Sequence, residues 1–303
     1  MAALAADNLC HASKGGSMPQ PHVTTVRMRR LGSELRKLRE NAGYTIEQVA
    51  EHLECSPSRI SRIETGKAQP PKQREIRDLL ELFGTADVQT RDTLLQLAKE
   101  AAQPGWYNEF QDVFPPRFGS YIGLESEAAE LRHFDNQLVH GLLQTPEYAR
   151  EVLQTTLFGE ASKTIDRLLE LRLARQQILD RMEPPFALWV IMDENVFRRP
   201  VGEAPVVRGQ VRRLLEAAEA PNITLQVLPF GKGAHVGLDG PFSLLGFPEP
   251  TDPDVVYVES QAGNAYLEQP HQVNRMTTKF NLLVASALDP RETTSFLRGL
   301  EKE

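Results

Sequence analysis

Apolar residues in the first third of the chain recur with the spacing of helices. Leu31, Leu35, Leu38 and Ala42 form one stripe of an amphipathic helix, and Gly43 provides its stop signal. Two further apolar stripes of this kind lie between residues 76 and 102. Together with two helices between these regions, the pattern predicts five helices, enough for a compact all-α domain.

The two helices in between carry clear start signals. Thr45 is a good N-cap, and Gln48 completes a capping box three residues later. Ser56 is a second N-cap, followed by Pro57 at the first helical position, where its missing N–H costs nothing. The second of these helices ends near Gly66. Their apolar faces consist of Ile46, Val49, Ala50 and Leu53 in the first helix, and of Ile60 and Ile63 in the second.

The remainder of the chain mixes helical and strand patterns. Short apolar runs at 186–192, 223–230, 242–247 and 255–259 are typical of strands, and the last two follow Gly/Pro turns as in an antiparallel pair. Helical spacing is found at 122–134, 146–156, 165–181, 206–218 and 272–287. Strands scattered among helices, some of them without a crossover helix, predict an α+β domain.

The helix pair that starts at Thr45 has the features of a helix-turn-helix. The small residue Ala50 lies where the two helices must cross closely, and Glu54-Cys55-Ser56 provides a tight turn. On a helical wheel Ile60 and Ile63 point inward, and Arg59 lies on the flank, where a phosphate would pass. The outward positions are Ser58, Ser61, Arg62 and Thr65. A narrow buried face opposite a short, polar, cationic face is what a reading helix requires.

The charge distribution agrees with a nucleic-acid partner for this region only. The chain has a net charge of -7, but residues 27–77 contain 12 Lys/Arg and 7 Asp/Glu. A basic segment joined to an acidic body is expected when one module meets phosphate and the other does not. The two cysteines, Cys10 and Cys55, lack disulfide or metal-ligand spacing, and no apolar run is long enough to span a bilayer. We therefore expect a cytoplasmic protein with no membrane partner.

The segment TIEQVAEHLECSPSRISRIETGK resembles the xenobiotic-response-element (Cro/repressor-type) helix-turn-helix family. The resemblance implies that the third helix of the domain enters the major groove of double-stranded operator DNA. It also implies a partly buried ion pair between Arg39 and Glu64. The DNA-binding residues expected are Ser56, Pro57, Ser58, Arg59, Ser61, Arg62 and Lys67. Among them Pro57, Ser58 and Arg62 occupy base-reading positions, and Arg59 and Lys67 face phosphate.

Two residues depart from the pattern of that family. Pro57 has no side-chain donor, so specificity would shift to Arg62, Ser58 and the local shape of the DNA. Ile46 replaces the polar residue that commonly contacts phosphate at the start of the second helix, which puts that contact in doubt.

A longer resemblance extends over nearly the whole chain. The segments YIGLESEAAELRHFD, GLLQTPEYAR, PNITLQVLPF and DGPFSLLGF look like those of actinobacterial antitoxin-like regulators with an uncharacterised C-terminal domain. This resemblance implies a small partner protein bound by that domain. The expected organisation is a disordered segment at 1–26, a five-helix DNA-binding domain at 27–102 with its helix-turn-helix at 45–66, a linker at 103–120, and an α+β regulatory, dimerisation and partner-binding domain at 121–303.

Three functions stay open at this point. The first is a homodimeric transcriptional regulator whose C-terminal domain senses a ligand or partner, and the second is an antitoxin that neutralises a small protein and autoregulates. The third, an enzyme fused to a DNA-binding module, is the weakest. The carboxylates Asp193, Glu194 and Glu259 have no accompanying nucleophile or metal-ligand pattern, and the glycine-rich loop 231–237 matches no phosphate-binding motif. We expect no enzyme activity, no metal and no cofactor.

Overall fold

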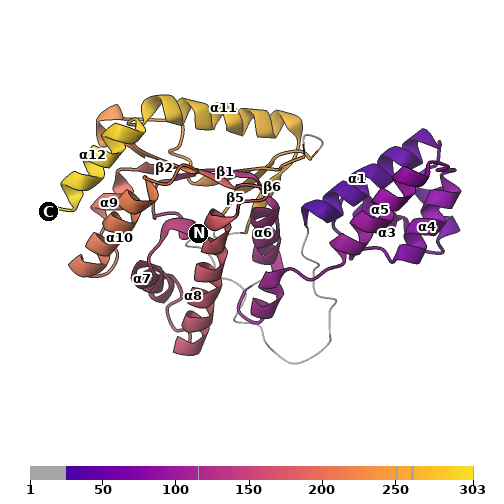
Figure 1. Ribbon diagram of the computed structural model, residues 1–303, viewed down its shortest axis with the longest axis horizontal. Helices are drawn as coiled ribbons and strands as arrows, with labels where there is room; N and C mark the ends of the chain where they lie inside the picture. The colour runs from indigo at the N-terminus through magenta and orange to yellow at the C-terminus, as the bar shows by residue number, and fades with distance from the viewer. Residues whose placement is uncertain (1–24, 115, 250–251, 261–262, 303) are drawn as a thin grey trace. The chain divides into compact units, whose positions relative to one another are not determined.

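The computed structural model describes residues 25–114, 116–249, 252–260 and 263–302. The N-terminal segment that was expected to be disordered lies outside the described residues as far as residue 24. The chain divides into two compact units, which Figure 1 shows coloured along the sequence. The first unit contains residues 25–111 and Pro116–Glu127, and the second contains residues 112–114 and 128–302.

Five α-helices form the main part of the first unit. Four of them begin at a residue whose side chain accepts a hydrogen bond from a backbone N–H three residues later: Thr25, Thr45, Ser56 and Asp87. The five helices are α1 (Val26–Asn41), α2 (Ile46–His52), α3 (Pro57–Glu64), α4 (Gln73–Leu82) and α5 (Val88–Ala101). The 3₁₀ helix η1 (Trp106–Phe110) and the helix α6 (Pro116–Glu127) complete the unit.

The five α-helices α1–α5 surround an apolar core. Leu31 and Leu35 of α1, Ile60 and Ile63 of α3 and Leu80 of α4 are at most 3% exposed within it. The stripes of apolar residues therefore face one another, and the capped helix ends lie at the surface. Burial of this kind stabilises a helix of eight residues such as α3, which would not be stable alone.

The second unit is built on a six-stranded mixed sheet with the strand order β3-β2-β1-β4-β5-β6. The first three strands in that order pair in parallel, and the remaining pairs are antiparallel. The strands are β1 (Glu130–Asp135), β2 (Ala187–Asp193), β3 (Ile223–Leu228), β4 (Phe242–Gly246), β5 (Val255–Val258) and β6 (Ala265–Leu267).

Helices cover both faces of this sheet. Figure 1 shows α11 along one face and α7 and α8 on the other. On the α11 face, Phe280 and Leu283 of that helix pack against Phe134, Ile191 and other strand residues in an apolar cluster. The helices are α7 (Pro146–Thr156), α8 (Ser162–Gln176), α9 (Asn195–Arg198), α10 (Ala204–Ala217), α11 (Pro270–Ser286) and α12 (Pro290–Leu300), with short 3₁₀ turns between them.

The predicted fold class, an all-α N-terminal domain followed by an α+β domain, is confirmed, but several boundaries differ. The helix expected at 122–134 is wrong in its second half: α6 ends at Glu127, and β1 follows at Glu130–Asp135. Residues 103–120, expected as a linker, contain η1 and the first turn of α6, and α12 follows the helix expected to be last. In the part of the chain that is described, no helix is both long and apolar enough to cross a membrane.

Candidate nucleic-acid interface

The α2–turn–α3 segment is fixed by its own side chains. Oγ1 of Thr45 accepts from the backbone N–H of Gln48 (3.3 Å), and Oε1 of Gln48 accepts from the N–H of Thr45 (2.9 Å), which closes the capping box. Oγ of Ser56 accepts from the N–H of Arg59 (3.3 Å) at the start of α3. Between the helices Glu54 adopts φ 51°, a left-handed conformation that reverses the chain in a short turn. Helix α3 is therefore set at a defined angle to α2.

The inner side of α3 is in close contact with α1. Ile60 and Ile63 are buried, and a Cβ atom placed on Gly32 of α1 would collide with the carbonyl oxygen of Ile63 and lie 2.7 Å from that of Glu64. Only glycine allows this approach of the two backbones. Gly66, just after α3, adopts φ 68° and packs against the backbone of Arg29 in the same way.

An ion pair joins the same two helices. Nε of Arg39 donates to Oε1 of Glu64 (2.6 Å) and Nη2 donates to Oε2 (3.0 Å), with side chains 9% and 6% exposed. A third donor, Nη1, reaches the carbonyl oxygen of Tyr44 (2.9 Å). The hydrogen bond to Glu64 raises the pKa of Arg39 against the opposing effect of burial. The structure thus brings together the two residues that the resemblance pairs, in a bidentate arrangement.

The outer side of α3 is uncovered. Seven predicted DNA-binding residues lie there or just beside it, and all of them are exposed: Ser56, Pro57, Ser58, Arg59, Ser61, Arg62 and Lys67. They offer hydroxyl groups and three cations, and no acidic residue of α3 interrupts them because its single carboxylate, Glu64, is turned inward to Arg39. Such a surface can form hydrogen bonds to base edges and ion pairs to phosphate.

Two of these cations already have partners within the chain. Nη2 of Arg59 lies 2.5 Å from Oε1 of Glu75 on α4, and Nη2 of Arg62 donates to the carbonyl oxygen of Lys67 (3.3 Å). The bond of Arg62 is long and exposed, so a guanine could replace it at little cost. Arg59 must instead break or share its ion pair with Glu75 before it can bind phosphate.

Sequence reasoning missed Gly32, Gly66 as a packing residue, and Glu75. Gly32 could have been found, because a glycine on the buried stripe of a helix normally marks a close approach. Glu75 could not, since its contact with Arg59 joins residues 16 positions apart on different helices.

Two of the carboxylates singled out in the second unit, Asp193 and Glu194, pair with side chains of the same unit. Oδ2 of Asp193 lies 3.2 Å from Nε2 of His235, in the loop 231–237. Oε1 of Glu194 pairs with Arg198 (2.8 Å), and its Oε2 accepts from the N–H of Phe230 (2.9 Å). Burial acts to raise the pKa of Glu194, but these hydrogen bonds hold it below its usual value. Among the described residues no group of three His, Cys, Asp or Glu side chains is arranged to hold a metal ion.

Comparisons with known proteins identify both parts of the chain. Residues 30–94 match a family described as a helix-turn-helix domain, and residues 118–299, more than half of the chain, match a domain of unknown function (DUF5753). A search of curated proteins and a search of solved structures give no match. The chain therefore belongs to the DUF5753 family, and it carries a helix-turn-helix DNA-binding domain of the kind found in transcriptional regulators.

Proposed function

We propose that this protein is a sequence-specific transcriptional regulator of the xenobiotic-response-element type, which places α3 in the major groove of operator DNA. One observation carries the proposal: the single carboxylate of α3 is locked inward on Arg39, which leaves a face of hydroxyls and cations exposed. Arg62 is the principal base-reading residue, since its guanidinium can bind guanine in a bidentate manner. Arg59 and Lys67 bind phosphate.

We propose further that the regulator acts as a cytoplasmic homodimer on an inverted repeat. One helix-turn-helix contacts too few bases for useful specificity, and two-fold dimers of such domains read half-sites about one helical turn apart. The second unit is acidic, so it is better suited to dimerisation and to sensing a ligand or a partner protein than to DNA binding. We propose a regulatory and not an enzymatic role for this unit, in which Asp193 pairs with His235 and Glu194 with Arg198.

The antitoxin alternative rests only on the resemblance to antitoxin-like regulators. It requires a small protein that binds the second unit, and it retains the same use of α3 for autoregulation. The two functions therefore share the DNA-binding test below and differ in whether a small protein partner co-purifies with the chain.

The experiment begins with genome-wide mapping of bound DNA, which yields the operator and its half-site spacing. Fluorescence anisotropy on operator and random DNA across a salt series then compares three variants. Arg62→Ala should weaken operator binding by about 1–3 kcal/mol and random DNA much less. Arg59→Ala and Lys67→Ala should weaken both DNAs about equally and lower the salt slope by about one unit.

Lys99→Ala is the matched control. It removes one exposed cation from α5, a helix that packs on α1 and α4. Circular dichroism confirms that each variant is folded. A folded Arg62→Ala protein that binds operator as tightly as Lys99→Ala would show that Arg62 does not read bases. Wild-type affinity in all four variants would show that α3 is not the DNA-binding surface.

A further inference from the structure

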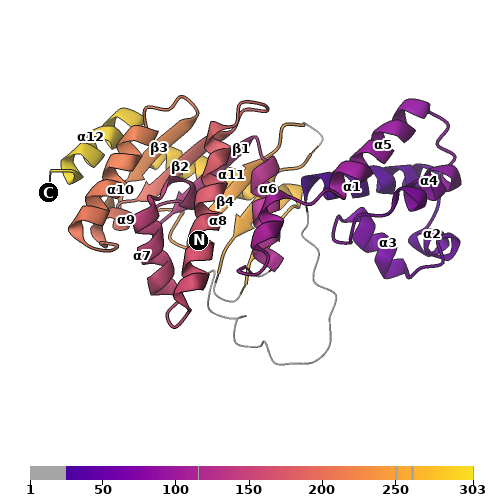
Figure 2. The same cartoon turned by 60° about the horizontal axis from the view of Figure 1, so that its bottom comes forward.

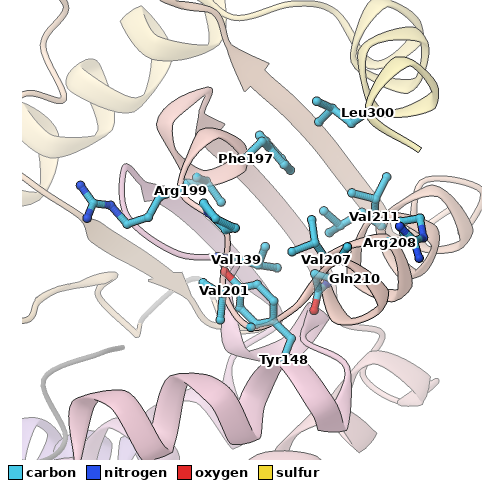
Figure 3. Close-up of a pocket in the computed structure, with 15 residues that line it drawn as sticks. Val139, Tyr148, Phe197, Arg199, Val201, Val207, Arg208, Gln210, Val211 and Leu300 are labelled. Atoms are coloured by element: carbon cyan, nitrogen blue, oxygen red, sulfur yellow. Dashed lines mark hydrogen bonds between the residues drawn. The ribbon is translucent and has the colours of Figure 1, made fainter. Parts of the chain in front are cut away.

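The second unit contains a pocket of about 430 Å³. It lies between the segment that follows β1, the chain from α9 to α10, helix α10 itself and the end of α12, as Figure 3 shows. Pockets of about 300–1,000 Å³ are the usual size for small-molecule sites. The volume therefore suits a small organic ligand.

The interior of the pocket is mainly apolar. Among its lining residues Val139, Val211 and Leu214 are buried, and Phe197 and Leu300 are partly exposed. In Figure 3 the apolar side chains surround the hollow, with Val201 and Val207 on the two sides of Val139. An aliphatic body of a ligand would find van der Waals contact on several sides here.

Two polar side chains that line the pocket, Tyr148 and Gln210, have a hydrogen-bond donor available for a ligand. The hydroxyl oxygen of Tyr148 accepts from the N–H of Val139 (3.4 Å), and among the described residues its own hydrogen has no acceptor. Burial raises the pKa of Tyr148 to about 12, so this hydroxyl is a donor at neutral pH. Oε1 of Gln210 accepts from the N–H of Thr145, and its Nε2 donates to the carbonyl oxygen of Leu143 (2.8 Å each). The second N–H of this amide takes part in neither bond.

The charged groups of the pocket are both cations. Arg199 and Arg208 are exposed, and within the described parts of the chain neither side chain forms an ion pair or a hydrogen bond. Figure 3 shows their guanidinium groups at opposite sides of the apolar centre. No acidic residue lines the pocket. The site thus offers apolar contact, unused donors and positive charge, and a complementary ligand has an apolar body with anionic acceptor oxygens.

We propose that this pocket binds a small carboxylate with an aliphatic body, and that such a molecule is the ligand class sensed by the second unit. The sensing role rests on the proposed function, whereas binding of the ligand can be measured without DNA. The flexible chain of such a carboxylate would lie against the valines, with its charge near Arg199 or Arg208. Tyr148 would donate to an acceptor oxygen that enters the pocket.

Isothermal titration of the full-length protein tests the proposal with three probes of equal chain length: octanoate, octanol and octylamine. Octanoate should bind at least tenfold more tightly than octylamine, and its affinity should fall as salt is raised. The Arg199→Gln/Arg208→Gln double variant should lose about tenfold in octanoate affinity and little in octanol affinity. Val207→Trp, which fills the pocket, should abolish binding of both.

Arg212→Gln provides the matched control, because Arg212 is an exposed arginine of α10 outside the pocket lining. Equal affinity for octanoate and octylamine would overturn the proposal, as would octanoate binding that the double variant and Val207→Trp leave unchanged. Absence of measurable octanoate binding would also overturn it and favour a protein partner at this face. Operator binding is measured on the same samples, so a failure of DNA recognition is seen separately from a failure of ligand binding.

Discussion

Nη2 of Arg59, in the first turn of α3, lies 2.5 Å from Oε1 of Glu75 in the first turn of α4. The cation expected to bind phosphate is therefore engaged by a carboxylate in the free protein. The two side chains are 48% and 26% exposed, so the pair is a surface ion pair worth at most about 1 kcal/mol. Phosphate can replace Glu75 without a large penalty, but it has to compete with it.

We predict that Glu75→Gln tightens binding to operator and random DNA alike. Removing the competing charge should raise both affinities by about two- to fivefold at low salt, the equivalent of up to about 1 kcal/mol. Glutamine keeps an oxygen for the N–H of Lys72, which Oε2 of Glu75 now accepts (2.8 Å), so the start of α4 should remain intact. Fluorescence anisotropy on the two DNAs measures the change. Glu81→Gln, an exposed residue of the same helix, controls for net charge, and equal effects of the two substitutions would contradict a specific competition.

A second prediction concerns the Arg39–Glu64 pair. Glu64→Ala leaves the guanidinium of Arg39 buried without its carboxylate and should destabilise the helical unit by about 3 kcal/mol. Differential scanning calorimetry of the full chain should show that this unit unfolds at a lower temperature than in the wild type. Glu40→Ala removes an exposed carboxylate that lies 3.5 Å from the same arginine and should lower the melting temperature much less, because solvent screens this contact. Similar melting temperatures for the two variants would mean that the buried Arg39–Glu64 ion pair stabilises the unit no more than the exposed contact of Arg39 with Glu40.

A third prediction separates helix propensity from packing. Alanine is favoured over glycine by about 1 kcal/mol inside a helix, so Gly32→Ala would stabilise α1 in isolation. In the folded chain the new Cβ would collide with the end of α3, 2.7 Å from the carbonyl oxygen of Glu64. We expect a net loss of about 1–3 kcal/mol, the usual cost of overpacking. Gly43→Ala cannot serve as the control, because Gly43 adopts φ 77°, where any other side chain would be strained. The control is Ser33→Ala on the exposed side of α1, which should be neutral or stabilising. Chemical unfolding of both variants decides the sign.

The helical domain could be predicted because its signals are local. Thr45 and Ser56 cap helices within three residues of themselves, and the spacing of Ile60 and Ile63 places both on one face. The exposed face of α3 follows from the same periodicity. None of these inferences needs a contact between distant parts of the chain.

The second unit was harder to predict for the opposite reason. β1 is a central strand that contains His133 and Asp135, and such polar residues are rare in buried strands. They are accommodated because Nδ1 of His133 lies 2.8 Å from Oγ of Ser243 on β4, and Oδ1 of Asp135 accepts from the N–H groups of Gln137 and Leu138. The bond to Ser243 joins residues 110 positions apart, so periodicity alone favoured a helix here. The Arg59–Glu75 pair escaped prediction for the same reason.

His140 lies beside these polar residues on the α8 side of the sheet and is only 2% exposed. Its Nδ1 accepts from the N–H of Leu142 (3.4 Å), its Nε2 has no partner among the described residues, and its ring centre lies 4.4 Å from that of His133. Burial lowers the pKa of His140 well below 6.5, and the nearby positive charges of Arg175 and Arg172 lower it further. The imidazole is therefore neutral in the folded protein at pH 7.

The last prediction follows from this depressed pKa. Below about pH 6.5 the unfolded chain takes up a proton on His140 and the folded chain does not, so stability is lost as pH falls, by up to about 1.4 kcal/mol per pH unit. Above pH 6.5 both states are neutral and the contribution vanishes. His140→Asn keeps an acceptor for Leu142 and cannot titrate, so its stability should fall less than that of the wild type between pH 6.5 and 5. Urea unfolding followed by Trp189 fluorescence, in a Trp106→Phe background, reports on the second unit. His271→Asn removes an exposed histidine and should follow the wild-type curve. If His140→Asn follows it as well, protonation of His140 is not linked to folding.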